Sequence, residues 1–182
     1  VYTEFIGAHG NEAGLVFDDV TGQGGIVRLM ILESGAKART VNKYLGKGWI
    51  VEACKGHVQD LPSNGKGKGR SKAMWASKNG DLPEPPWDWT DGAERVINKI
   101  LEKATRKGVE EIYIATDPDR EGEFIAWRLS ILFAEFPVVK RVTFNEITET
   151  AVNEAIQESG EIDMDLVDAA KVRRFMDRLV GY

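Results

Sequence analysis

The stretch "IYIATDPDREGEF", residues 112–124, places four acidic side chains and one arginine directly after an apolar run. The run "IYIA" has the composition of a buried strand. Carboxylates this close together repel one another, so the arrangement is costly unless a positive group lies among them. The stretch therefore predicts a buried strand that ends at a charged site.

The spacing of the acids predicts how they are arranged. Asp117, Asp119 and Glu121 occur at every second position, so an extended segment would point all three side chains to one side. A helix would turn Asp119 away from the other two, and Pro118 favours the extended form for the residue before it. We therefore expect three carboxylates to converge at the carboxyl end of a parallel strand, where open α/β sheets place their sites.

Three clustered carboxylates suit a hard cation with oxygen ligands. Mg²⁺ is the natural candidate, because proteins often hold it with one or two carboxylates plus a phosphate. Calcium fits less well, since "DPDREGE" lacks the spacing of a helix-flanked calcium loop. The alternative is a helix N-terminus whose solvated acids are placed favourably against the helix dipole.

A second pair of charged residues follows an earlier apolar run, "IVRLMIL" at residues 26–32. Glu33 ends the run, and Lys37 stands four residues further on, in the first turn of the next expected helix. If this strand neighbours the one before Asp117, crowding by carboxylates would favour the protonated form of Glu33 and make it a proton donor or shuttle. Lys37 could then meet a phosphate oxygen. An exposed Glu–Lys pair on a helix is the alternative.

Strands and helices alternate along the rest of the chain, which predicts an α/β fold with a mainly parallel sheet and helices on both faces. Glycines and Pro62 predict a loop after residue 55. The last helix is expected to point Val172, Phe175, Met176 and Leu179 inward. The other strands are expected at 49–54, 110–116 and 138–144, and the other helices at 33–46, 93–104, 123–133, after Thr148 and from Asp165.

Length and composition predict one cytoplasmic domain. The 182 residues contain no apolar stretch of membrane-spanning length, no signal-peptide pattern and a single cysteine, Cys54. The net charge of −5 argues weakly against nucleic acid as a partner. The charge is unevenly spread, however, because residues 63–80 carry no acid.

Two basic segments are candidates for binding nucleic acid. Residues 63–80 contain Lys66, Lys68 and Arg70 between glycines, with Trp75 nearby for base stacking. In "KVRRFMDR", residues 171–178, Lys171, Arg174 and Arg178 share one helix face. A solvated loop and a salt-bridged surface helix explain the two segments equally well. His57, alone beside a glycine, is interpreted as structural.

Five motifs together resemble type IA DNA topoisomerases, and topoisomerase I more than topoisomerase III. They are "LESGAKARTVNKYLG", "GHVQDLP", "IYIATDPDREGEFIAWRL", "RVTFNEIT" and "IDMDLVDAAKVRRFMDRLVGY". The resemblance implies an N-terminal Toprim domain with a Rossmann-like fold over residues 26–160. Residues 63–90 would form a basic insertion and residues 161–182 a helix leading into the next domain, while the role of residues 1–25 stays open.

The resemblance also implies roles for individual residues. Glu33 would assist proton transfer at the scissile phosphate, Lys37 would stabilise its charge, and Asp117, Asp119 and Glu121 would bind Mg²⁺. The single-stranded DNA path would include Arg173, Arg174, Asp177 and Arg178. Gly35 departs from the pattern, because the family usually has proline there, which leaves the helix start less rigid.

The nucleophilic tyrosine of these enzymes lies in a later domain, and no tyrosine of this chain has a matching context. The resemblance therefore implies an ATP-independent topoisomerase whose remaining domains are partners of this chain, with no membrane involved. The fragment alone is expected not to relax supercoils. A self-sufficient Mg²⁺-dependent Toprim nuclease, which would use the same acids to activate water, is the alternative.

Overall fold

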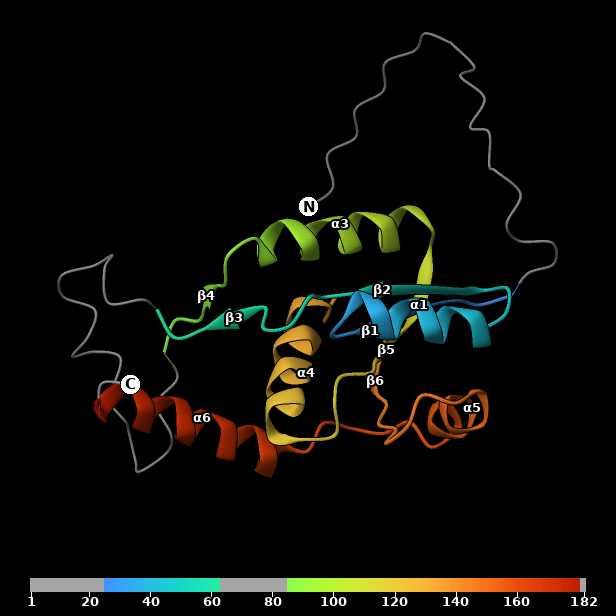
Figure 1. Ribbon diagram of the computed structural model, residues 1–182. Helices are drawn as coiled ribbons and strands as arrows, with labels where there is room; N and C mark the ends of the chain where they lie inside the picture. Colours follow the sequence, from blue (N-terminus) through green and yellow to red (C-terminus); the bar gives the residue numbers. More distant parts are fainter. Residues whose placement is uncertain (1–24, 63–84, 181–182) are drawn as a thin grey trace, which may run out of the picture.

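A four-stranded parallel sheet lies at the centre of the chain (Figure 1). The computed structural model describes residues 25–62 and 85–180. In space the strands follow the order β2-β1-β5-β6, and each neighbouring pair is parallel. The prediction of a mainly parallel sheet is confirmed, as is the expected adjacency of the first strand and the strand before Asp117. The strands are β1 (Val27–Leu32), β2 (Trp49–Ala53), β5 (Val109–Ile114) and β6 (Val138–Arg141).

Helices cover both faces of the sheet, as expected. Because successive strand residues point to opposite faces, Leu29 and Ile31 pack in one core with α3 and α4, while Met30 and Leu32 pack in another with α1 and α5. Figure 1 shows α3 above the strands and α5 below them. The helices are α1 (Gly35–Tyr44), α3 (Ala93–Arg106), α4 (Arg120–Leu132) and α5 (Glu149–Gln157).

The last helix, α6 (Met164–Val180), packs against α4 with a different face from the one predicted. Val172 and Met176 are 42% and 54% exposed, so the expectation that they point inward was wrong, whereas Phe175 is buried. The side chain of Leu179 lies outside the described residues. Long cations take the inner face instead: Lys171 Nζ lies 4.2 Å from the ring centroid of Trp127. Cation–π contact and burial of the apolar stem stabilise such an arrangement.

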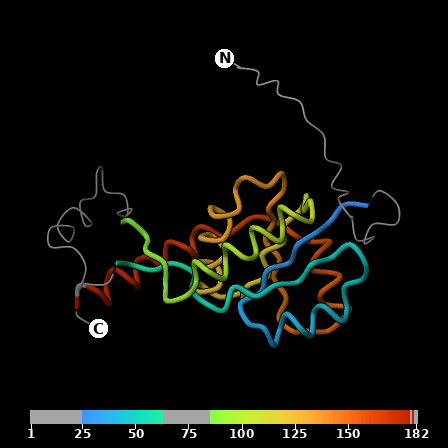
Figure 2. Tube along the Cα trace, turned by 90° about the horizontal axis from the view of Figure 1, so that it is seen from above, coloured from blue at the N-terminus to red at the C-terminus, as the bar shows by residue number. Residues whose placement is uncertain are grey.

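A second, two-stranded sheet lies beside α6, which the sequence did not predict. Strands β3 (Gln59–Asp60) and β4 (Asp88–Trp89) pair antiparallel, and Figure 2 shows them next to the C-terminal part of α6. Arg178 of α6 donates a hydrogen bond of 2.5 Å to the carbonyl oxygen of Pro62. The insertion expected at residues 63–90 is described only from residue 85 onward, and this part contains β4. No helix among residues 25–62 and 85–180 is long and apolar enough to cross a membrane.

Candidate active site at the carboxyl edge of the sheet

Glu33 and Asp117 follow neighbouring strands and meet where those strands end. The backbone N–H of Asp117 donates a hydrogen bond of 2.9 Å to Glu33 Oε1, across a separation of 84 residues. Backbone pairing continues past the strand, since the N–H of Ala115 bonds to the carbonyl of Ile31 at 2.8 Å. The expectation that Glu33 lies beside the acidic segment is confirmed.

Lys37 supplies a positive group at this edge. Its ammonium forms an ion pair with the carboxylate of Asp117. Ser34 fixes the lysine in the first turn of α1, because its side chain accepts a hydrogen bond of 3.3 Å from the Lys37 N–H and caps the helix. Gly35 is the first residue of α1, at the position where the family usually has proline. The serine cap therefore holds the start of the helix without that proline. Repulsion among the acids is thereby offset within the chain itself.

Asp119 begins a helix rather than continuing an extended segment. Its backbone is extended, with φ −137° and ψ 172°, but α4 starts at Arg120, and Asp119 Oδ1 accepts a hydrogen bond of 2.7 Å from the Gly122 N–H. The prediction of an extended segment through Glu121 was therefore wrong beyond Asp119. The physical reason is that a capping aspartate satisfies a backbone donor which the first helical turn leaves without an intrahelical partner.

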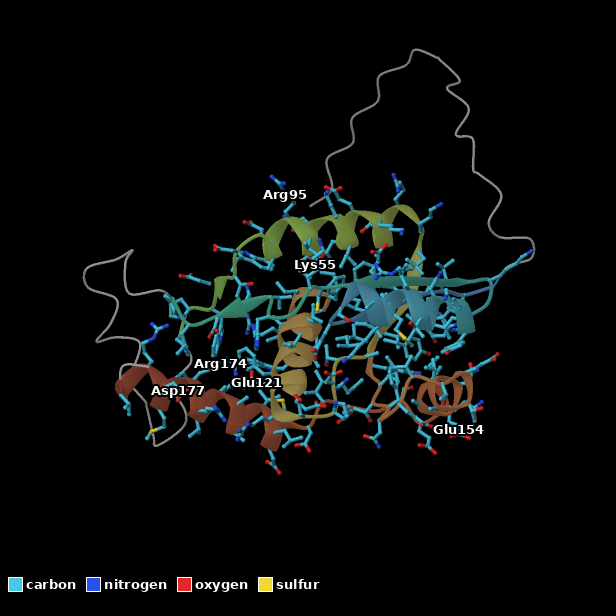
Figure 3. All side chains as sticks on the ribbon, in the orientation of Figure 1. Lys55, Arg95, Glu121, Glu154, Arg174 and Asp177 are labelled. Carbon is cyan, nitrogen blue, oxygen red and sulfur yellow. The ribbon has the colours of Figure 1, made fainter. Side chains whose placement is uncertain are left out.

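Glu121, in the first turn of α4, faces two residues from other elements. Arg174 of α6 binds its carboxylate, with NH2 2.5 Å from Oε2, and His57 Nε2 lies 3.7 Å from the same oxygen. The Arg174 NH2 group is also 3.1 Å from His57 Nδ1. Figure 3 shows Glu121 and Arg174 where α4 and α6 meet. Both residues thus belong to the site, and the side chain of Arg174 is only 10% exposed.

The interpretation of His57 as purely structural missed this contact. The sequence carried part of the signal, because His57 follows the strand expected at 49–54 and the carboxyl ends of parallel strands meet at one edge of a sheet. The structure adds that β2 lies next to β1. A histidine shortly after β2 is therefore placed near residues that follow β1 and β5. What the sequence could not give was the position of α6, which carries Arg174 to the same point.

The acids at this edge fit Mg²⁺ in chemistry but do not converge on one point. Asp117 is bound to Lys37, Asp119 to a backbone N–H, and Glu121 to Arg174. Among the described residues no three His, Cys, Asp or Glu side chains lie close enough together to hold a metal ion. Carboxylate oxygens are nevertheless the ligands that Mg²⁺ prefers, and Glu33 adds a fourth carboxylate to the edge.

A buried ion pair fixes the backbone under the acids. Arg141, at the end of β6, lies 2.7–2.8 Å from Glu123 Oε1, and both side chains are almost completely buried. The same guanidinium donates hydrogen bonds of 2.8 Å and 2.9 Å to the carbonyl oxygens of Thr116 and Asp117. The backbone N–H of Asp163 donates to Glu123 Oε2 at 3.2 Å. The fourth acid of the opening motif is therefore a positioning residue, a role the sequence did not indicate.

Gly122 allows α4 to start directly against the preceding segment. A Cβ atom at this position would lie 1.9 Å from the carbonyl oxygen of Asp117 and 2.7 Å from its carbonyl carbon. The hydroxyl of Thr116 also donates a hydrogen bond of 2.7 Å to the Gly122 carbonyl. The glycine in "DREGE" is thus required by a close backbone approach, which holds the Asp117 backbone in place.

Cys54 lies near Glu33 but cannot act as a thiolate at neutral pH. Burial raises the pKa of its thiol to about 12, with a smaller contribution from the Glu33 carboxylate. The protonated thiol is neither a nucleophile nor a good metal ligand. The chemistry of this edge therefore rests on carboxylates, a lysine, an arginine and a histidine.

A comparison with known protein families matches residues 28–147 to the Toprim domain. This chain belongs to the Toprim domain family. The chain is 38% identical over 175 residues to DNA topoisomerase 1 of Escherichia coli strain K12, and 41% identical over 180 residues to DNA topoisomerase 1 of Pseudomonas aeruginosa. Both alignments cover 85% of this chain but only 20% of the relative.

Solved structures agree with these relatives. Full-length topoisomerase I from Thermotoga maritima superimposes with a TM-score of 0.67 and 37% sequence identity, over 84% of this chain and 24% of that protein. The resemblance stated from the motifs is confirmed. The chain spans about a fifth of the length of the curated relatives it matches.

The residues expected to line a DNA path occupy different environments in the chain. The side chains of Arg173 and Asp177 on α6 are more than half exposed, and Arg173 Nε lies 3.8 Å from Asp177 Oδ2. Arg174 and Arg178 instead bind the chain itself, through Glu121 and the Pro62 carbonyl. The remaining predicted residues, Lys66, Lys68 and Arg70, lie outside the described part of the chain.

Proposed function

We propose that this Toprim domain is the metal-binding and proton-transfer part of a type IA DNA topoisomerase, closer to topoisomerase I than to topoisomerase III. One observation carries the proposal: Asp117 contacts both Glu33 and Lys37 at the carboxyl edge of the sheet, although the two acids are 84 residues apart in sequence. The relatives' names support the same reaction. The complete enzyme would cut one DNA strand, pass another through and reseal it in the cytoplasm without ATP.

Each residue at the edge has a role in this proposal. Asp117, Asp119 and Glu121 would hold Mg²⁺, which when bound supplies positive charge to phosphate oxygens. Glu33 would hold the proton that is exchanged with the leaving or attacking oxygen, and its contact with the Asp117 N–H fixes one of its oxygens. Lys37, beside Asp117, would stabilise charge on the scissile phosphate.

The nucleophile would come from the remaining domains of the same protein. Both described tyrosines form hydrogen bonds with residues other than Glu33, Asp117, Asp119 and Glu121. The Tyr44 hydroxyl donates to the Ile147 carbonyl, and the Tyr113 hydroxyl donates to Glu111 Oε2. The single-stranded DNA would reach the acids past the exposed Arg173 and Asp177 of α6, with Arg174 and Arg178 beneath them. The segment that carries Lys66, Lys68 and Arg70 would add phosphate contacts.

A chimera tests the proposed reaction. The matched segment of the Escherichia coli relative is replaced by this chain, and relaxation of supercoiled plasmid is followed at several Mg²⁺ concentrations. We expect relaxation, and we expect Glu33→Gln to slow it by about 100-fold or more, because a positioned proton donor contributes that much. Glu154→Gln, an exposed acid on α5 shown in Figure 3, is the matched control and should relax as the chimera does. Equal rates for Glu33→Gln and the control would contradict the proton-transfer role.

The nuclease alternative needs only the isolated chain. Supercoiled plasmid incubated with this chain and Mg²⁺ is expected to be neither nicked nor relaxed, because the proposed nucleophile is missing. Nicking that depends on Mg²⁺ and disappears in Asp117→Asn would favour the nuclease. Relaxation by the pure chain would show that a tyrosine of this chain acts as the nucleophile.

A further inference from the structure

A row of cations runs along one side of α3, outside the site described above. Arg95, Lys99 and Lys103 occur at every fourth residue of the helix, so they lie on one side of it and succeed one another by about 6 Å along its axis. The apolar face of α3, with Ile97 and Ile100, is turned into the core. The cations therefore form a flank between the buried face and solvent.

Two adjoining cavities extend from this row toward the acidic edge, by which we mean the carboxyl edge of the sheet with Glu33, Asp117, Asp119 and Glu121. One, of about 490 Å³, is lined by Lys55 and by the three α3 cations. The next, of about 320 Å³, shares Lys55 and Arg95 with the first and extends to His57. We call the two cavities together the α3 groove. His57 Nε2 also lies 3.7 Å from Glu121 Oε2, so the α3 groove ends at a residue that contacts one of the acids. Figure 3 shows Arg95 on the outer side of α3 and Lys55 below the helix, toward the sheet.

The charge of the α3 groove is positive although the chain as a whole has a net charge of −5. Its lining contains four cations, Lys55, Arg95, Lys99 and Lys103, against two acids, Glu52 and Asp91. Lys103 is bound to Glu52. Within residues 25–62 and 85–180, no ion pair or side-chain hydrogen bond engages the other three cations. The groove thus presents three cations that have no protein counter-ion among the described residues.

The backbone at Lys55 is an independent sign of function. Lys55 has φ 66°, and no other non-glycine residue in the described part of the chain has a positive φ. A side chain in the left-handed region is strained, and such residues gather at ligand-binding sites. Glycine, as at the adjacent Gly56 with φ 93°, would relieve the strain but would remove the ammonium group from the groove. The lysine therefore occupies a position where glycine is favoured by conformation.

We propose that the α3 groove binds the phosphate backbone of single-stranded DNA and leads that strand to the acidic edge. The inference rests on the proposed function, because it assigns the part of the substrate next to the reacting phosphate. Lysine and arginine recognise phosphate oxygens without reading bases. No Phe, Tyr or Trp side chain lines either cavity and His57 is engaged with Glu121 and Arg174, so binding there should depend on phosphate contacts and be independent of sequence. The α3 groove includes no residue of α6, so it would hold a different part of the strand from the part that passes Arg173 and Asp177.

Charge removal in the α3 groove tests the proposal on the isolated chain. Fluorescence anisotropy measures binding of a labelled oligothymidylate about 16 nucleotides long at several salt concentrations. Arg95→Gln/Lys99→Gln is expected to weaken binding by about tenfold at low salt. Each phosphate contact with a single strand contributes about 0.7 to the salt slope, so losing two contacts should lower the slope by about 1.4. Lys55→Asn should weaken binding as well, because asparagine tolerates positive φ but carries no charge.

The matched control removes the same charge elsewhere. Lys43→Gln/Lys47→Gln changes two exposed lysines that do not line the groove, one in the last turn of α1 and one in the turn after it. The affinity of this variant should equal that of the wild-type chain. Unchanged binding in Arg95→Gln/Lys99→Gln would overturn the proposal. An equal loss in both double variants would also overturn it, because net charge alone would then govern binding. Competition by inorganic phosphate at concentrations that match the oligothymidylate's phosphate would show a site for free anion and not for DNA.

Failure of this inference can be told apart from failure of the proposed function. The groove variant Arg95→Gln/Lys99→Gln keeps every acid, so any Mg²⁺ binding by the chain should be unchanged in it. Conversely, Asp117→Asn alters the acidic edge but leaves the α3 groove intact, and it should still bind the oligothymidylate. Loss of oligothymidylate binding in Asp117→Asn with the groove variant unaffected would place the strand at the acids alone and overturn the groove.

Discussion

Replacing Arg141 with methionine is expected to lower the free energy of unfolding by about 3–5 kcal/mol. The substitution leaves the carboxylate of Glu123 buried without its cation, and it also removes the donors to the carbonyl oxygens of Thr116 and Asp117. An uncompensated charge in the core is far more costly than the loss of a surface pair. Urea denaturation at equilibrium, followed by circular dichroism, measures the change.

The matched control is another arginine–glutamate pair on the same sheet. Arg28 Nε lies 2.7 Å from Glu111 Oε2, but the arginine side chain is 35% exposed. The hydrogen bond from Arg28 lowers the pKa of the Glu111 carboxyl. Because water screens this pair, Arg28→Met should lower the free energy of unfolding by about 1 kcal/mol or less. An equal loss of stability in the Arg141→Met and Arg28→Met variants would contradict the claim that the buried Arg141–Glu123 pair fixes the backbone at Thr116 and Asp117.

Replacing Gly122 with alanine is expected to lower the free energy of unfolding by about 3 kcal/mol, near the upper end for overpacking. The new Cβ atom would lie 1.9 Å from the Asp117 carbonyl oxygen, and backbone atoms on both sides must move because neither is the flexible end of a side chain. The hydrogen bond from the Asp117 N–H to Glu33 should be lost with that movement. Urea denaturation and the amide chemical shift of Asp117 measure the two effects.

Gly46→Ala provides the control for this substitution. No heavy atom lies within 4 Å of a Cβ built at Gly46, and its φ is not positive. Alanine there should leave stability unchanged or raise it by up to about 1 kcal/mol through the unfolded state. A Gly122→Ala variant as stable as Gly46→Ala, with the Asp117 amide unshifted, would contradict the close approach.

The strands of the sheet could be predicted because each carries its own signal. The runs at 26–32 and 110–116 each contain four consecutive apolar residues, 29–32 and 112–115, that are buried on both faces of the sheet, as is usual for parallel strands between helices. The structure pairs these runs as β1 and β5. Alternation of strands and helices then fixed the layers. Glu33 and Asp117 could be placed together from this information alone, because both follow strands that end at one edge.

The rest of the site depends on contacts that no local pattern records. The face of α6 that packs on α4 carries cations over aromatic rings, such as Arg174 with its guanidinium carbon 3.7 Å from the Phe124 ring centroid. A rule that apolar side chains mark the buried face therefore selected Val172 and Met176 wrongly. The position of α6 is also what brings Arg174 to Glu121. The sequence indicated a DNA contact for this arginine, which stays a prediction, but did not indicate its contact with an acid.

The conformation after β5 was misjudged for a related reason. The spacing of Asp117, Asp119 and Glu121 fits an extended segment, but Asp119 is equally good as a helix cap. The choice is made by Gly122, whose missing Cβ allows α4 to begin against the Asp117 carbonyl. Such a close approach between two backbone segments is visible only once the fold is known. The acids consequently lie along one edge with separate partners.

A magnesium titration followed by backbone amide chemical shifts tests most directly the central claim that this edge binds Mg²⁺ in a type IA topoisomerase. The wild-type chain should show saturable shifts at residues 117–121 and at Glu33. These shifts should vanish in Asp117→Asn/Asp119→Asn, in which asparagine can keep the helix cap, and should persist in Glu154→Gln. Shifts that are missing in the wild-type chain, or that merely follow ionic strength when NaCl replaces MgCl₂, would contradict the account.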